Sequence, residues 1–443
     1  MSVGSDPSKL PPMRLVPALL LLSAAPAFAQ ISPIAPRPLP GITIQSPVCS
    51  GAPTLDVAPG AALPSVAAAL AEAQRLDACS VTVRIAAGTY SDPLIVSRPT
   101  TLVGASRLST VLTGGIVDRT VSALTLRTLT LRDTPGVAVL VETASATTTL
   151  EQVTVLRAHG YGVKQQGGTL VMRSSVVFET VAGAADRTEG AGVLIQGGAH
   201  ADLQDVLLAT NASNALVARG PGTHVVARRT NTLVTGNNPN FPPTPPDVTT
   251  TAERSGDPRF PFQLRTTGGL RGFGAVSVSE GATFLGEDMR VERSKLFGIV
   301  AVAGAHVHLR RVVVLRTESV ALDRYHSVGG YDVVSVEDSV VEVHDFDVGA
   351  SGVGLAVDRA WLTLQTGHVH DNTMVGVITR SPRDSGRGCH HDVAFERNGV
   401  PYDAGGDIYH VATPTLDVSS LVSTDDSPPP PPPPAECASV PWE

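Results

Sequence analysis

Short segments in which apolar and polar residues strictly alternate recur along the chain, each after a turn residue that is usually glycine. The clearest segment is Gly304-Ala305-His306-Val307-His308-Leu309, and similar ones begin at Gly168, Gly198, Gly222, Gly281 and Arg359. Alternation with a period of two is typical of strands that are buried on one face. Gly198 and Gly222 are 24 residues apart, and Gly281 and Gly304 are 23 apart. This repeat length predicts the stacked coils of a parallel β-helix, each built from short strands.

The repeats are interrupted at residues 237–262, where prolines are too frequent for a central strand. We interpret this segment as a Pro-rich loop insertion that leaves one corner of a continuous β-helix, because continuous stacking buries the faces of neighbouring coils. The alternative is a linker between two separate β-helices. Two separate β-helices would need two further caps, and the sequence shows none.

Residues 63–76 have the period of a helix, with apolar side chains on one face and polar ones on the other. An amphipathic helix directly before a β-helix is expected to cover the first coil, whose open edge would otherwise pair with other chains. We therefore predict a β-helix over residues 63–410 that is capped by a helix at 63–76. Val81–Ile85 is its first strong strand.

The stretch after this helix reads CSVTVRIAAGTYSDPLIVSRPTTLVGAS and continues with TVLTGG. In this order, the helix and the strands resemble the amino-terminal part of the pectin-lyase-like right-handed parallel β-helix superfamily, and pectinesterases in particular. The resemblance spans residues 63–410. It implies an all-β fold, a single-stranded right-handed parallel β-helix (solenoid) with an N-terminal amphipathic capping helix.

The resemblance does not extend to the catalytic motifs of that superfamily. Nothing in the chain resembles the QDTL, DFIFG or LGRPW motifs of pectinesterases, and the polygalacturonase set of NTD, DD, GHG and RIK is not matched. Pectate lyases need a compact acidic cluster for calcium and an arginine base. Asp345 and Asp347 come closest to such a cluster, without a suitable arginine. The fold by itself does not specify an activity.

Residues 1–29 have the features of a secretory signal peptide. Met13-Arg14 is basic, Leu15–Ala25 is apolar, and Ala27-Phe28-Ala29 fits a cleavage site. The apolar run is too short to span a bilayer, and no later stretch is long enough. We therefore predict an exported protein, extracellular, periplasmic or at the cell surface, with no transmembrane segment. Residues 30–62 are expected to form an extended lead-in, and residues 411–443, with seven consecutive prolines, a Pro-rich C-terminal tail.

The four cysteines fall as one pair near each end of the predicted β-helix. An even number of cysteines in an exported chain favours disulfides, and we predict Cys49–Cys79 and Cys389–Cys437. Their spacing does not fit a zinc site, so neither a metal site nor a cofactor is predicted. The formal net charge of −8 argues against a nucleic-acid partner and against binding to anionic lipid.

The residue after the small residue of each repeated segment is expected to point outward. This row consists of Leu170, His200, His224, Thr283, His306 and Trp361. Because neighbouring coils are about 4.8 Å apart, His200 and His224 should be neighbours. The row is either a ligand-binding face or an ordinary polar surface, since outward strand positions must be polar.

Seven of the twelve histidines lie between residues 326 and 410, together with several aromatic residues. His344 and His368 are 24 residues apart, about one coil, and are expected to stack. The candidate catalytic residues are His344, Asp345, His368, His370 and Asp371. The candidate ligand-binding residues are Trp361, His368 and His344, because an exposed indole is suited to stacking on a sugar ring. The alternative is a polar face beside the carboxyl-terminal cap.

Three functions are compatible with these features. The first is an exported, non-catalytic β-helix that binds a polysaccharide or a cell-envelope glycan along one face. The second is a polysaccharide lyase or glycoside hydrolase of unrecognised type, with its site between residues 326 and 410. The third is a structural surface spacer without a specific ligand.

Overall fold

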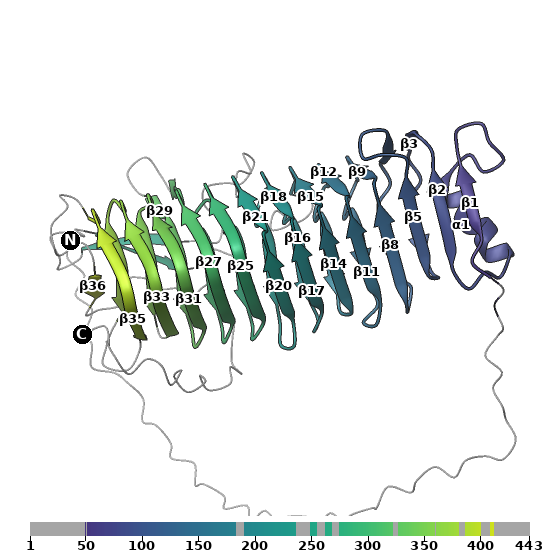
Figure 1. Ribbon diagram of the computed structural model, residues 1–443. Helices are drawn as coiled ribbons and strands as arrows, with labels where there is room; N and C mark the ends of the chain where they lie inside the picture. The colour runs from purple at the N-terminus through teal and green to yellow at the C-terminus, as the bar shows by residue number, and fades with distance from the viewer. Residues whose placement is uncertain are drawn as a thin grey trace, which may run out of the picture. The chain divides into compact units, whose positions relative to one another are not determined.

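The computed structural model describes residues 49, 51–182, 190–235, 249–254, 262–267, 274–321, 327–358, 360–380, 386–399 and 408–411. The predicted signal peptide, most of the expected lead-in and nearly all of the predicted C-terminal tail lie outside these residues. The strands of the two long sheets stack in parallel into a right-handed solenoid (Figure 1). The predicted all-β, right-handed parallel β-helix is confirmed. No helix in the described part of the chain has the length and apolar character needed to cross a bilayer.

The first sheet runs along the solenoid in two columns of strands. The first column consists of β1 (Thr54–Val57), β2 (Val81–Ile85), β5 (Thr100–Gly104), β8 (Ala123–Arg127), β11 (Thr147–Glu151), β14 (Thr169–Arg173), β17 (His200–Gln204), β20 (His224–Arg228), β25 (Thr283–Glu292), β27 (His306–Leu315), β31 (Val340–Gly349), β33 (Ala360–His370) and β35 (Gly386–Glu396). The second column consists of β3 (Gly88–Tyr90), β6 (Thr110–Leu112), β9 (Thr130–Arg132), β12 (Thr154–Leu156), β15 (Val176–Phe178), β18 (Leu207–Ala209) and β21 (Asn231–Leu233). From β25 onward, a single long strand spans both columns.

The second sheet closes each coil on the other side of the core. Within the described ranges it consists of twelve strands, all parallel. They are β4 (Leu94–Val96), β7 (Ile116–Asp118), β10 (Val139–Val141), β13 (Val163–Gln166), β16 (Val193–Gln196), β19 (Leu216–Arg219), β24 (Val276–Ser279), β26 (Phe297–Val302), β30 (Tyr331–Val336), β32 (Val353–Asp358), β34 (Val375–Arg380) and β36 (Ile408–Val411).

The solenoid continues across the Pro-rich insertion. β19 pairs in parallel with β24, and His224 of β20 is in register with Thr283 of β25. Within the insertion, β22 (Thr249–Arg254) and β23 (Phe262–Thr267) form an antiparallel pair. A second antiparallel pair, β28 (Ser319–Ala321) and β29 (Ser327–Gly329), follows β27 in the chain. Both insertions lengthen a coil without interrupting the stack.

Aliphatic side chains fill the space between the two sheets. Leu126 of β8, Leu150 of β11 and Met172 of β14 are in register and fully buried. Phe284 of β25 is the largest fully buried side chain among the described residues. It lies beside Gly286, where a Cβ atom would come within 3.0 Å of Cε1 of Phe284. The missing side chain of this glycine therefore makes room for the phenyl ring.

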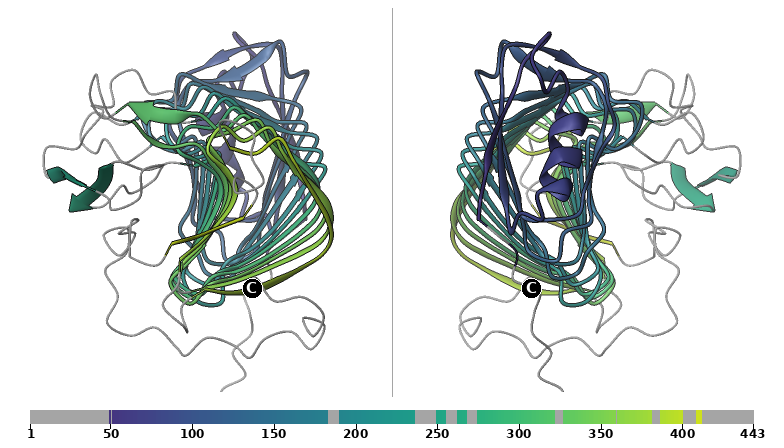
Figure 2. Two further views of the ribbon diagram at one scale, coloured as in Figure 1. Left: turned by 90° about the vertical axis from the view of Figure 1, so that its left-hand side faces the viewer. Right: turned by 90° about the vertical axis from the view of Figure 1, so that its right-hand side faces the viewer.

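The amino end of the solenoid is covered by α1 (Val66–Arg75), which lies within the predicted helical range and across the end of the core (Figure 2). Its buried face consists of Val66, Ala69, Leu70 and Ala73. These residues belong to the same core as the strands. Ser65 caps the helix, because its side chain accepts a hydrogen bond from the backbone N–H of Ala68 at 3.2 Å.

The first sheet begins earlier than the sequence predicts. β1 lies within the expected lead-in and pairs in parallel with β2, with Thr54 in register with Thr82. Only four residues form this strand, which is too short a run for a period to be recognised. The start of the β-helix is therefore set by pairing with β2 rather than by a local pattern.

Cys49 and Cys79 form the predicted disulfide, next to β1 and α1. At the other end, Cys389 of β35 is buried. Its predicted partner, Cys437, lies outside the described residues, so the Cys389–Cys437 pair stays a prediction.

The first sheet bends at stacked residues that have positive φ although they are not glycine. Asp288, Arg311 and Asp345 form one such corner, with φ of 53°, 52° and 53°. The guanidinium of Arg311 donates two hydrogen bonds to Asp288, at 2.6 and 3.0 Å, across the two coils. The bend at Asp345 divides β31, so His344 and Asp347 lie on opposite sides of this corner.

Small polar side chains form a buried column where the chain leaves the first sheet. Asn372 donates from Nδ2 to Oδ1 of Asn398 at 2.9 Å, and Oγ of Ser351 accepts from the backbone N–H of Thr317 at 2.8 Å. Asp332 of β30 points at this column and is fully buried. Its Oδ1 accepts from the hydroxyls of Thr317 and Ser351, both at 2.6 Å, while Oδ2 has no hydrogen-bond partner among the described residues.

Burial raises the pKa of Asp332 well above its usual value. Below the pKa of about 3.9 of the unfolded chain, the carboxyl is protonated in both states and has no effect on pH dependence. Above that pH the unfolded state releases a proton that the folded state keeps, so stability falls as the pH rises. The Asp332→Asn variant has no carboxyl at this position, so it lacks this fall in stability with rising pH. The melting temperature of Asp332→Asn minus that of the wild type should increase between pH 4 and pH 7. A difference that does not change with pH would contradict the buried, protonated carboxyl.

Candidate functional site

The candidate site lies on three consecutive long strands, β27, β31 and β33. Their register places nine outward positions in three rows of three, and we call these positions the outward face. The outward face consists of His306, His308, Arg310, Val340, Glu342, His344, Trp361, Thr363 and Gln365. The alternating pattern of the sequence is the reason that these side chains share one side of the sheet.

A shallow groove of about 310 Å³ crosses the outward face where it meets the corner. It is lined by His308, Arg310, His344, Asp345, Gln365 and Thr366. Every one of these side chains has hydrogen-bonding atoms, and they come from three coils. The groove therefore runs across the strands, parallel to the axis of the solenoid.

A histidine–carboxylate pair stands beside this groove. Nδ1 of His308 is 2.9 Å from Oε2 of Glu342 on the next strand. The ring of His344 lies 5.1 Å from the ring of His308, between centroids. Asp345 at the corner is 3.8 Å from Nε of Arg310. His308 and Arg310 thus each have a carboxylate nearby, whereas His344 packs against the ring of His308.

Trp361 points outward, as the alternation predicts, but it is half-buried rather than exposed. Its neighbours in the alternation, Leu362 and Leu364, are fully buried. The indole Nε1 donates a hydrogen bond to Oγ1 of Thr363 at 3.0 Å. This bond holds the ring on the outward face of β33.

A second cluster lies on the other side of the corner. Nε2 of His370 is 3.0 Å from Oδ1 of Asp347, and its Nδ1 is 2.8 Å from Oδ2 of Asp371. The rings of His368 and His370 stack with centroids 4.5 Å apart. Arg397 donates hydrogen bonds to both carboxylate oxygens of Asp371, at 2.5 and 2.8 Å. These bonds, and the contact with His370, hold the pKa of Asp371 well below its usual value.

The prediction that His344 and His368 stack is wrong. His344 is in register with Gln365, and His368 is in register with Asp347. The pairing of Val340 with Trp361 shows that this coil is 21 residues long, three fewer than the spacing used for the prediction. The predicted site residues therefore divide into two groups. His344 and Asp345 line the groove, and Trp361 lies on the same outward face, four residues before Gln365 on β33. His368, His370 and Asp371 belong to the second cluster.

For the rest of the outward row, one prediction is confirmed and one is wrong. His200 and His224 are in register, with ring centroids 6.0 Å apart, as predicted. Leu170, predicted to point outward, is fully buried, because Thr169 takes the outward position in register with His200. Glu342 and Gln365 could not be selected from the sequence, since a single acidic or amide residue on a strand has no signal until the register is known.

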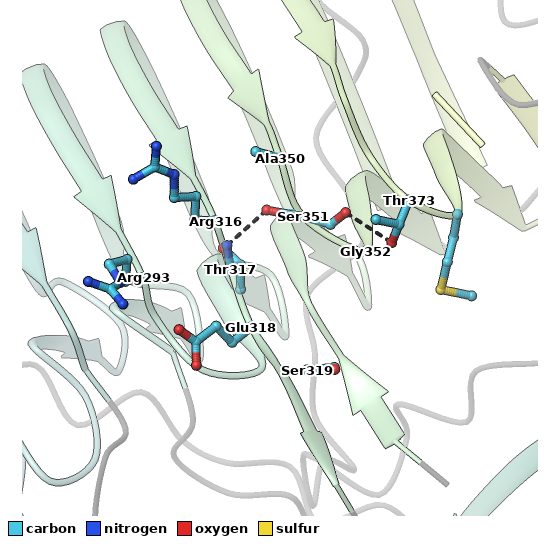
Figure 3. A pocket seen from close by; sticks show the side chains of 10 residues that line it. Arg293, Arg316, Thr317, Glu318, Ser319, Ala350, Ser351, Gly352 and Thr373 are labelled. Atoms are coloured by element: carbon cyan, nitrogen blue, oxygen red, sulfur yellow. Dashed lines mark hydrogen bonds between the residues drawn. The ribbon is translucent and has the colours of Figure 1, made fainter. Parts of the chain in front are cut away.

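A larger hollow of about 580 Å³ lies at the corner that follows β25, β27 and β31 (Figure 3). Arg293, Arg316 and Glu318 stand at one side, and Ser351 bonds to Thr317 and Thr373 in its wall. Nη1 of Arg316 is 3.0 Å from Glu292. None of the predicted site residues lines this hollow.

No family model matches the chain, and no curated protein matches it. Several solved structures are similar. The periplasmic alginate epimerase AlgG is 9% identical over 74% of this chain and 76% of its own, with a TM-score of 0.43. The catalytic domain of GH87 α-1,3-glucanase in complex with nigerose is 12% identical over 79% and 68%, with a TM-score of 0.48. The A-module of the Azotobacter vinelandii mannuronan C-5 epimerase AlgE4 is 14% identical over 79% and 87%, with a TM-score of 0.42. At these identities the likeness concerns the fold alone.

Proposed function

We propose that the protein binds a neutral polysaccharide along the outward face of β27, β31 and β33, without cleaving it. The observation that carries this proposal is the shallow groove of hydrogen-bonding side chains from three coils, with the half-buried indole of Trp361 on the same outward face. Hydroxyl groups of a sugar pair with such side chains, and an aromatic ring packs against the apolar face of the sugar. The groove is open and follows the stack of coils, which suits a long polymer rather than a small molecule.

The charges beside the groove favour a neutral glycan. Arg310 has Asp345 nearby, and His308 is paired with Glu342. At the same corner, Arg311 donates to Asp288 and to Glu287. A polyanion needs a row of unneutralised basic groups, whereas these cations already have carboxylate partners.

The His308–Glu342 pair also supports a second candidate function, general acid–base chemistry on a bound glycan by a lyase or hydrolase. A carboxylate that orients a histidine is a common arrangement for proton transfer. His370 is less suited to this role, because carboxylates occupy both of its ring nitrogens. Binding without cleavage is the function that we favour.

A retention screen followed by product analysis separates these functions. The neutral polymers are dextran, soluble starch and a β-glucan, and the acidic ones are alginate and polygalacturonate. We expect retention on a neutral polymer, with no new reducing ends and no unsaturated products. New products would establish the enzyme instead, retention on acidic polymers alone would contradict the neutral ligand, and no retention at all would favour a structural spacer.

Trp361→Ala is expected to weaken binding of the retained polymer about tenfold or more, because it removes the stacking surface. His344→Ala should weaken it to a smaller extent. The melting temperatures of both variants should stay within a few degrees of the wild type, since both side chains point outward. His200→Ala combined with His224→Ala is the matched control and should bind as the wild type does. A large loss of stability in Trp361→Ala would show that the indole is a packing group.

We also propose that the protein is exported. The disulfide between Cys49 and Cys79 supports this proposal, because such bonds persist mainly in oxidising compartments. The predicted signal peptide at residues 1–29 points in the same direction. Amino-terminal sequencing of the secreted or periplasmic protein should begin at Gln30.

A further inference from the structure

The second cluster has a composition that sugar binding does not require. Asp347, His368 and His370 each offer one ligand atom, and these atoms lie within 4.8 Å of one another. His368 and His370 are two residues apart on β33, so both rings stand on the same side of the strand. Asp347 of β31 is in register with His368. Two adjacent strands thus bring two imidazoles and a carboxylate together outside the groove.

The hydrogen bonds behind His370 orient its ring. Nδ1 contacts Asp371, which is itself fixed by two hydrogen bonds from Arg397, and Nε2 then faces Asp347 at 3.0 Å. A histidine that binds a metal through one ring nitrogen usually donates the other N–H to a carboxylate, which sets the tautomer and the ring orientation. The pair Asp371–Arg397 provides this support.

His368 supplies an independent indication of a ligand. Its Nε2 is buried and has no hydrogen-bond partner among the described residues. The nearest carboxylate oxygen, Oε2 of Glu396, is 3.4 Å away. On the other side of the ring, Nδ1 is 3.9 Å from Oδ1 of Asp347. A buried ring nitrogen without a hydrogen bond is costly, and a bound cation would satisfy it.

We propose that Asp347, His368 and His370 bind one zinc ion, with Glu396 within reach as a fourth ligand. Zinc prefers imidazole and carboxylate ligands in a tetrahedron, in which neighbouring ligand atoms are about 3.3 Å apart. Nε2 of His370 and Oδ1 of Asp347 are already close to this distance, and a rotation of the His368 ring that turns its unpartnered Nε2 toward Asp347 supplies the third ligand. Transition metals with the same ligand preference, such as cobalt, should bind as well.

A second trio, His308, Glu342 and His344, has the same donor types. His308 and His344 line the groove assigned to the polysaccharide, and neither ring has a buried nitrogen that lacks a hydrogen-bond partner among the described residues. This trio therefore serves as the matched control for the zinc site.

The test is a zinc titration of the full chain, prepared metal-free and without a histidine tag, by calorimetry with metal analysis of the dialysed protein. We expect one ion per chain, a rise in melting temperature with zinc, and an absorption band of tetrahedral cobalt when Co²⁺ replaces it. His370→Ala and Asp347→Asn should lose the ion. Asp371→Asn, a positioning variant, should weaken zinc binding about 10- to 100-fold. Glu342→Gln should bind as the wild type does.

His368→Gln is a second ligand variant, in case His370→Ala alters folding. Stoichiometric binding that survives both ligand variants, or that is lost in Glu342→Gln, would overturn the assignment. An absence of binding by the wild-type chain would overturn it as well. These outcomes are independent of polysaccharide retention, which is tested by Trp361→Ala.

Discussion

Replacing Phe284 with alanine is expected to lower the free energy of unfolding by about 3–5 kcal/mol. The side chain is fully buried in β25, in the coil that follows the Pro-rich insertion. Gly286 lies beside the phenyl ring and has no side chain that could fill the cavity left by the substitution. Neighbouring coils hold the walls of this cavity in place, so little of the lost packing is recovered.

Urea unfolding followed by circular dichroism measures this loss. Phe284→Leu should recover part of the stability, because leucine fills a portion of the cavity. Ile95→Ala is the control, since Ile95 on β4 is 56% exposed, and it should change stability by less than about 0.5 kcal/mol. A loss below about 1 kcal/mol for Phe284→Ala would contradict a tightly packed core at this coil.

Removing the disulfide in a Cys49→Ser, Cys79→Ser double variant is expected to cost about 3–4 kcal/mol. The bond closes a segment of 30 residues, which contains β1 and α1. In the chain-entropy description, the cost arises because the unfolded segment gains conformations once the link is absent. The loss should be local, because α1 covers the first coil and the coils of a solenoid contact only their neighbours.

Limited proteolysis and thermal unfolding detect this effect. The double variant should be cleaved between residues 50 and 80 before the rest of the solenoid is attacked. Ser80→Ala, next to the disulfide, controls for the local substitution and should behave as the wild type does. Unchanged protease resistance of the double variant would show that the packing of α1 alone holds the amino end.

The fold could be predicted because its signal is local and repeated. Alternation in segments such as 304–309 marks the strands, and their spacing marks the coil. The corners were not predictable in the same way. Asp288, Arg311 and Asp345 share the positive φ of one stacked corner although their residue types differ, so residue type alone did not mark the corner.

The site was predictable only in part, because it depends on the register between coils. His306 pairs with Val340, Val340 with Trp361, and Trp361 with Arg387, at separations of 34, 21 and 26 residues. Insertions at the corners cause these differences. A constant period therefore placed His344 beside the wrong neighbour, although it placed His200 beside His224 correctly.

Labelling of histidines with diethylpyrocarbonate, quantified by mass spectrometry, tests the proposed binding face most directly. The protein is labelled with and without a saturating amount of the neutral polymer that retains it. Labelling of His308 and His344 should fall strongly when the polymer is bound, whereas labelling of His200 and His224 should not change. Protection of His200 and His224, or no protection of His308 and His344 under saturation, would contradict binding on the outward face of β27, β31 and β33.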